Sequence, residues 1–151
     1  MAFFNSKLRY ALCASIDLAL QPNTIACQSR EIAARQSIPG PYLDQILASL
    51  KSAGIVRSVR GAGGGYTLAR AAERILISEI VKALMRGDRL FASSTEDEKV
   101  VADSPGSLWV VRDFEEQVES LLCEKLSSVT LADLVSKKQS QDDVMSHMPD
   151  I

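Results

Sequence analysis

The chain has 151 residues, of which 46% are apolar and 24% are charged, so it is long enough to bury one folded core. The longest stretch without a charged residue covers residues 18–29 and contains a proline and several polar residues, which excludes a membrane span. Residues 1–74 hold nine basic and four acidic residues, a net charge of +5, whereas residues 75–151 hold eight and fifteen, a net charge of −7. A basic half joined to an acidic half suggests that one face binds a polyanion.

The reactive side chains are few. Cys13, Cys27 and Cys123 are too scattered for a disulfide framework, so we expect reduced thiols. His147 is the single histidine, which leaves little material for a histidine-based metal site or nucleophile. We expect no secretion signal, because Asp17 interrupts the first apolar run and no small-residue cleavage site follows it. We therefore expect a cytoplasmic protein that is not an enzyme and has no metal site.

The first half of the chain predicts three helices. The first is expected to be capped by Ser6 and to end before Pro22, since its apolar positions recur every four residues. A short helix follows over residues 29–36, and a third helix over residues 42–53 ends at a glycine. The third helix has one apolar face, made of Leu43, Ile46, Leu47 and Leu50. Two short helices around a tight turn are typical of a helix-turn-helix motif.

A β-hairpin is expected directly after the third helix. The β-rich runs 55–60 and 66–70 flank a glycine-rich turn at residues 61–65, and a hairpin at this place in a helix-turn-helix protein is a wing. The turn joins two strands and lacks the Gly-Lys-Ser/Thr ending of a P-loop. The glycines therefore indicate a wing tip rather than a nucleotide site.

Three arginines, Arg57, Arg60 and Arg70, flank the expected wing tip. One interpretation is that they are solvated charges that protect strand edges from aggregation. Beside a helix-turn-helix we favour the other, in which a thin glycine hairpin enters the minor groove of DNA. Arg60 is then the residue inserted into the groove, and Arg57 and Lys51 contact phosphates.

The second half of the chain predicts a helix over residues 78–86, a loop, a long helix over residues 107–127 and a last short helix over residues 131–137. The long apolar stripe favours pairing with a second copy, and Trp109 and Phe114 are expected in a core. The expected organisation is a winged helix-turn-helix domain at residues 1–87, a flexible loop at 88–106, a dimerisation helix with a short helix at 107–138, and a disordered tail at 139–151.

Residues 32–68 read IAARQSIPGPYLDQILASLKSAGIVRSVRGAGGGYTL. Together with KLRYAL near the start and SSVTLADLV near the end, they resemble the IscR/NsrR/CymR-type (Rrf-type) family of winged-helix transcription regulators. The resemblance implies a mainly α fold with a small β-hairpin wing and a long C-terminal dimerisation helix. It further implies a homodimer that represses transcription by binding double-stranded DNA at a palindromic operator, under redox, iron–sulphur or cysteine-related control. The positions that match the family at the DNA are Tyr42, Asp44, Gln45 and Arg60, with Gly63 and Gly64 in the wing tip.

The sequence departs from the family at two places. Pro39 and Pro41 stand where some relatives have serines, which removes hydroxyl and N–H donors, so base contacts do not carry over. Cluster-binding relatives have three cysteines in the loop before the long helix, whereas residues 87–106 contain neither cysteine nor histidine. We therefore expect no cofactor. An iron–sulphur cluster held by dispersed cysteines and carboxylates is the alternative.

Two further alternatives stay open from the residues alone. Cys123 and Cys27 are the candidate sensor thiols, but both also suit the role of small apolar fillers. The helix and wing could also dock an acidic protein instead of DNA, as a winged-helix interaction module without sequence-specific DNA binding.

Overall fold

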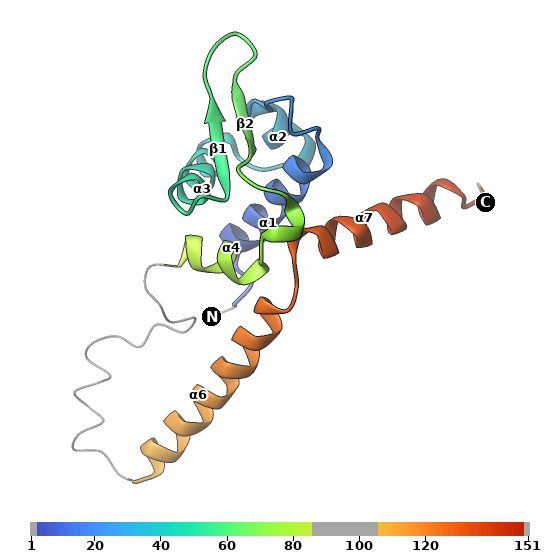
Figure 1. Cartoon of the computed structure of the whole chain (residues 1–151). Coiled ribbons are helices and arrows are strands. Elements are labelled where there is room, and N and C mark those ends of the chain that lie inside the picture. The colour runs from blue at the N-terminus through green and yellow to red at the C-terminus, as the bar shows by residue number, and fades with distance from the viewer. Residues whose placement is uncertain (1–2, 86–105, 150–151) are drawn as a thin grey trace.

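The computed structural model describes residues 3–85 and 106–149 (Figure 1). The expected mainly helical fold with a hairpin wing is confirmed. Within the described residues, no helix is long and apolar enough to cross a membrane. The elements are α1 (Ser6–Leu20), α2 (Ser29–Gln36), α3 (Gly40–Ser52), β1 (Val56–Val59), β2 (Gly65–Leu68), the 3₁₀ turn η1 (Ala72–Arg74), α4 (Ile77–Leu84), α6 (Gly106–Ser127) and α7 (Leu131–Ser146).

The core lies between α1, α2, α3 and α4, with β2 against α1. The apolar face expected for α3 is confirmed, because Leu43, Ile46, Leu47 and Leu50 are all fully buried. Ser6 does not cap α1 as expected. Asn5 has the extended backbone of an N-cap, and its side-chain oxygen accepts a hydrogen bond from the Leu8 amide at 2.9 Å.

The wing is an antiparallel hairpin in which Val56 pairs with Leu68 and Val59 with Gly65. Its second strand is also tied to the segment before α2, where Cys27 and Tyr66 exchange two backbone hydrogen bonds of 2.9 and 2.7 Å. Gly65 has a φ of 147°, and a Cβ at this position would lie 2.3 Å from the Cys27 carbonyl oxygen. Only glycine allows the wing to approach the helix-turn-helix this closely.

The turn between α6 and α7 is fixed to the winged domain. The Ile77 amide donates to the Val129 carbonyl at 2.9 Å, and the Leu131 amide donates to the Ile75 carbonyl at 2.8 Å. Leu126 and Leu131 on either side of this turn are buried in the core. The C-terminal end of α6 and the N-terminal end of α7 therefore meet at one anchored corner, and Figure 1 shows the two helices extending from it in different directions, with α6 on the side away from the wing.

Most of α6 is not covered by its own chain. Trp109 and Phe114, expected in a core, are 56% and 64% exposed, because only the C-terminal end of α6 packs against the winged domain. The expected flexible loop falls almost wholly on residues outside the described ranges, and its last residue, Gly106, begins α6.

The last helix is longer than the sequence predicts. We expected it to end at Lys137, with a disordered tail from residue 139, but α7 continues to Ser146. Its capping pair is as expected, since the Asp133 amide donates to Thr130 Oγ1 at 3.1 Å. Residues 138–143 of this helix are all polar, so apolar periodicity gives no signal there. Pairs four residues apart, such as Lys138 with Asp142 at 2.6 Å, support it instead.

Candidate nucleic-acid interface

The outward face of α3 carries three of the expected DNA-contacting residues. Asp44, Gln45 and Lys51 are all exposed, on the side of the helix opposite its buried apolar face. Tyr42 differs from them because it is half-buried, and its ring meets that of Tyr10 edge to face at a centroid distance of 5.6 Å. This contact with α1 holds the first turn of α3 in place.

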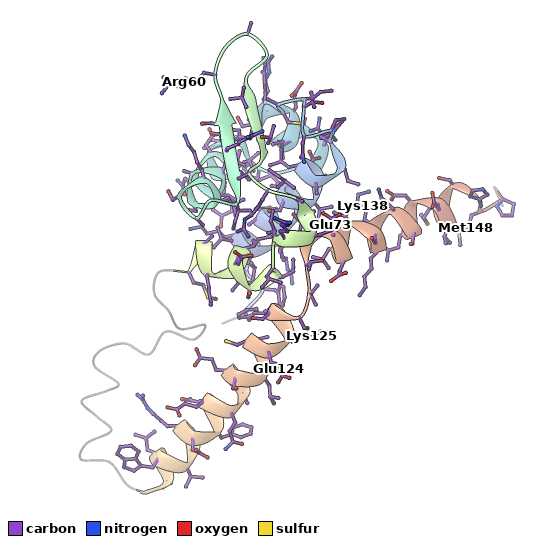
Figure 2. The ribbon with its side chains drawn as sticks, in the orientation of Figure 1. Arg60, Glu73, Glu124, Lys125, Lys138 and Met148 are labelled. Atoms are coloured by element: carbon purple, nitrogen blue, oxygen red, sulfur yellow. The ribbon has the colours of Figure 1, made fainter. Side chains whose placement is uncertain are left out.

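The wing tip projects beyond the rest of the domain (Figure 1). Arg60 is exposed, and Figure 2 shows its side chain pointing away from the protein. Within the described residues, no hydrogen bond involves this side chain. Gly63 is exposed, and a Cβ there would meet nothing within 4 Å, whereas a Cβ on Gly64 would lie 2.5 Å from the Val59 carbonyl oxygen. The two glycines therefore play different structural parts in the turn.

Arg57 lies on β1 with its guanidinium partly held. Its Nε donates a hydrogen bond of 3.1 Å to Thr67 Oγ1 on the opposite strand, while the residue as a whole is exposed. No carboxylate pairs with Arg57 within the described ranges. The arrangement leaves its charge available to an anion.

Arg70, which the sequence grouped with the arginines of the wing tip, serves the base of the wing instead. One of its terminal nitrogens lies 2.7 Å from Glu79 Oε1 on α4, and the other donates to the Arg74 carbonyl at 2.6 Å. The hydrogen bond from Arg70 is the main reason that the pKa of Glu79 lies below its ordinary value, and the Leu76 amide, which donates to the same carboxylate, lowers it further. Arg70 thus joins the wing to α4.

A buried ion pair, missed by the sequence analysis, joins the first two helices. Asp17 is 2% exposed and accepts hydrogen bonds of 2.7, 2.9 and 3.2 Å from Arg35, and a fourth of 2.9 Å from Gln36. The contact with Asp17 raises the pKa of the Arg35 guanidinium. The sequence does contain one indication of this pair, because Asp17 stands between Ile16 and Leu18, and an acid within an apolar run is a candidate for a buried, paired carboxylate. This pair sets the position of α2 on α1.

The described cysteines do not come together. Cys27 is 4% exposed in the core, Cys123 is half-buried on α6, and Cys13 is exposed on α1. Within residues 3–85 and 106–149, no three Cys, His, Asp or Glu side chains gather closely enough to hold a metal ion. Iron–sulphur clusters need several thiolates at one place. The donors that the described residues of a single chain offer therefore do not fit such a cluster.

Comparison with known proteins agrees with this geometry. A family model described as Rrf2, iron-dependent transcriptional regulator, matches residues 4–137. The chain belongs to the Rrf2 family. A protein of Synechocystis named as an HTH-type transcriptional regulator is 39% identical over 129 residues, which are 85% of this chain and 84% of that protein. An IscR of Cereibacter sphaeroides is 46% identical over 82 residues, 53% of each chain.

Solved structures of Rrf2-type proteins have the same fold. The structure of T. potens IscR has a TM-score of 0.69 and 33% identity, and it covers 97% of this chain and 92% of its own. CymR of B. subtilis, described as its global cysteine regulator, has a TM-score of 0.71 and 28% identity, with coverage of 91% and 98%. This Rrf2 protein is therefore a DNA-binding winged-helix transcriptional regulator and not an enzyme.

Proposed function

We propose that this Rrf2 protein acts as a homodimer that represses transcription from a palindromic operator in the cytoplasm. The observation that carries the proposal is the uncovered apolar face of α6. Its exposed members are spaced mostly three or four residues apart, and the largest exposures are 71% for Val110, 64% for Phe114 and 67% for Leu121. The whole set is Val110, Val111, Phe114, Val118 and Leu121, which we call the α6 stripe.

A second copy of the chain is the occupant that we propose for the α6 stripe. A helix of 22 residues is about 33 Å long. The α6 stripe itself spans residues 110–121, about 17 Å along the helix axis, and soluble monomers rarely expose so many large apolar side chains in one continuous strip. Two copies of α6 can cover each other through the same residues, as a two-fold axis requires. Dimerisation would then present two winged domains to the two halves of a palindrome.

In this dimer each α3 enters a major groove and each wing tip a minor groove. Asp44 and Gln45 are placed at base edges, where a carboxylate accepts a hydrogen bond from cytosine and an amide pairs with adenine. Lys51 and Arg57 are expected to contact phosphates, and Arg60 to enter the minor groove. Their exposure in the free protein supports these positions.

The proposed signal is redox, iron–sulphur or cysteine-related, as the likeness to a global cysteine regulator suggests. Because the thiols of one chain do not fit a cluster, we place the signal on the thiols themselves or on a ligand. Cys123 is the better candidate, since it is half-buried on the proposed dimerisation helix. The burial of Cys27 supports the role of an apolar filler for that residue.

The experiment that tests the proposal measures assembly and salt dependence together. Sedimentation should give a dimer, and a duplex that the protein selects from randomised DNA should bind two chains at half-sites about 34 Å apart. A plot of log affinity against log salt should have a steep slope, because phosphate contacts release counterions. A monomer would contradict the proposed dimer, and a flat salt plot would favour the alternative of a module that docks an acidic protein.

A further inference from the structure

Thr67 has a buried hydroxyl group that accepts a hydrogen bond from the exposed residue Arg57. It faces Arg57 directly across the hairpin, in the register that pairs Arg57 with Thr67. Thr67 is only 4% exposed, whereas Arg57 is exposed. Its hydroxyl oxygen accepts the hydrogen bond from Arg57 Nε, and no buried side-chain polar atom lacks a partner among the described residues. A side chain that reaches solvent is thus anchored at one point to a rigid strand.

Because only Nε of Arg57 is bound within the protein, the other nitrogens of its guanidinium can donate hydrogen bonds to a ligand. Arginine carries five N–H donors, one on Nε and four on its two terminal nitrogens. The bond to Thr67 uses the Nε donor, so the two terminal nitrogens, which form the fork that fits two phosphate oxygens, stay available. A guanidinium held in this way loses less rotamer freedom when it binds than a fully mobile one does.

The three arginines of the hairpin show three degrees of restraint. Both terminal nitrogens of Arg70 are engaged within the protein, so it has no fork to offer. The Arg60 side chain makes no hydrogen bond within the described residues and lies at the exposed tip. Arg57 is between them, with one nitrogen engaged and the fork available. This intermediate state suits a phosphate contact, which requires a fixed position rather than adaptation to a groove.

We propose that Thr67 is a positioning residue, which through its hydroxyl holds the guanidinium of Arg57 in the orientation that binds a DNA phosphate. The inference rests on the phosphate contact proposed above for Arg57. The competing explanation is that Arg57 merely satisfies a buried hydroxyl, in which case the bond matters for folding and not for DNA.

A double-mutant cycle separates these explanations. Thr67→Val keeps the shape and the β-branched side chain but removes the hydroxyl, Thr67→Ser keeps the hydroxyl, and Arg57→Ala removes the charge. Affinity is measured for the wild type, the three single variants and the Arg57→Ala, Thr67→Val double variant. The probes are the duplex selected from randomised DNA and an unrelated duplex at low salt, because a phosphate contact contributes to both. Unfolding by urea is measured in parallel.

Thr67→Val should weaken binding to both duplexes by about threefold to tenfold in the wild-type background, the effect of one hydrogen bond. It should have no further effect in the Arg57→Ala background, and Thr67→Ser should bind as the wild type does. Arg57→Ala should reduce the salt slope by about one unit per chain. Equal losses from Thr67→Val in both backgrounds, or no loss in either, would overturn the proposal.

Failure of this inference can be distinguished from failure of the proposed function. If Arg57→Ala binds DNA like the wild type while Arg60→Ala weakens binding, Arg57 contacts no phosphate and the role of Thr67 is overturned, but the operator-binding dimer stands. If the wild type itself shows no salt-dependent binding to duplex DNA, the proposed function fails first.

Discussion

The ion pair of Asp17 and Arg35 is unequal in burial, and this decides its energetics. The Asp17 side chain is 3% exposed and the Arg35 side chain 41%. Removing the arginine leaves a buried carboxylate with only Gln36 as a donor, whereas an unpaired arginine at this place can turn to water. The ion pair therefore affects stability chiefly because loss of Arg35 would leave the buried carboxylate of Asp17 without a counter-charge.

We accordingly predict that Arg35→Ala lowers the free energy of unfolding by about 2–3 kcal/mol, somewhat less than the loss of a fully buried pair because the arginine is partly exposed. The matched control is Asp142→Ala, which breaks the exposed pair with Lys138 on α7 and should cost less than about 0.5 kcal/mol. Urea unfolding at neutral pH measures both. Equal effects would mean that burial of Asp17 does not govern the pair.

The two adjacent glycines of the wing tip allow a second test at single residues. Gly64→Ala should lower the free energy of unfolding by more than about 1 kcal/mol, because its Cβ would lie 2.5 Å from the Val59 carbonyl oxygen. Gly63→Ala should change it by less than about 0.5 kcal/mol, since a Cβ there is in open space.

Gly63→Ala also tests the proposed path of the wing tip. If the tip enters the minor groove, the added methyl group should lower operator affinity while the urea midpoint stays unchanged. An affinity equal to that of the wild type would show that the tip does not approach the DNA closely.

At the scale of elements, the contact between the wing and α4 should make stability depend on pH. Arg70 holds the pKa of Glu79 below its ordinary value of 4.5, so the unfolded chain takes up a proton first as the pH falls. The contribution of this pair to stability is thus complete above pH 4.5 and is lost as the pH falls through the lower folded value. We predict that Glu79→Gln abolishes the part of the decrease in unfolding free energy at acid pH that comes from protonation of Glu79.

Urea unfolding between neutral pH and acid measures the effect. Glu73→Gln is the control, because Glu73 is an exposed acid on η1 with no ion pair in the described residues; Figure 2 labels its position. Its pH profile should follow that of the wild type. A Glu79→Gln profile that also follows the wild type would show that the pair with Arg70 does not couple to folding.

The elements that apolar periodicity governs could be predicted from the sequence. Local sequence patterns predicted the buried face of α3, the hairpin around the glycines and the helix at residues 29–36. The prediction of function came from the family resemblance. The extension of α7 to Ser146 could not be predicted in this way, because polar pairs hold its last turns. The roles of Asp17 and Arg70 depend on partners 18 and 9 residues away, which spacing along the chain does not reveal.

For the candidate site, the sequence predicted the exposed face of α3 and the exposed wing tip, but not the half-buried position of Tyr42 or the way each side chain is held. Asp44, Gln45, Lys51 and Arg60 reach solvent as expected, and their contacts with DNA stay predictions. The restraint on Arg57 depends on strand register, which only the folded hairpin defines.

At the scale of the whole molecule, the α6 stripe connects folding, assembly and DNA binding. Only the C-terminal end of α6 packs on its own domain, through Leu126 with Leu122 and Cys123, so the stripe toward the N-terminal end has no partner within the described chain. A charge placed in the stripe should leave the winged domain intact but prevent two copies from meeting, because an unpaired charge is costly in an apolar interface.

We therefore predict that Leu121→Glu converts the proposed dimer to a monomer and weakens binding to the selected palindrome, while a duplex with a single half-site binds the variant and the wild type alike. Ser120→Glu is the matched control, since it places the same charge on the neighbouring exposed residue of the same helix, outside the stripe. Sedimentation gives the assembly state, and the unfolding midpoint of each variant shows that the domain is folded. A Leu121→Glu protein that remains a dimer would assign the pairing surface to another part of the molecule.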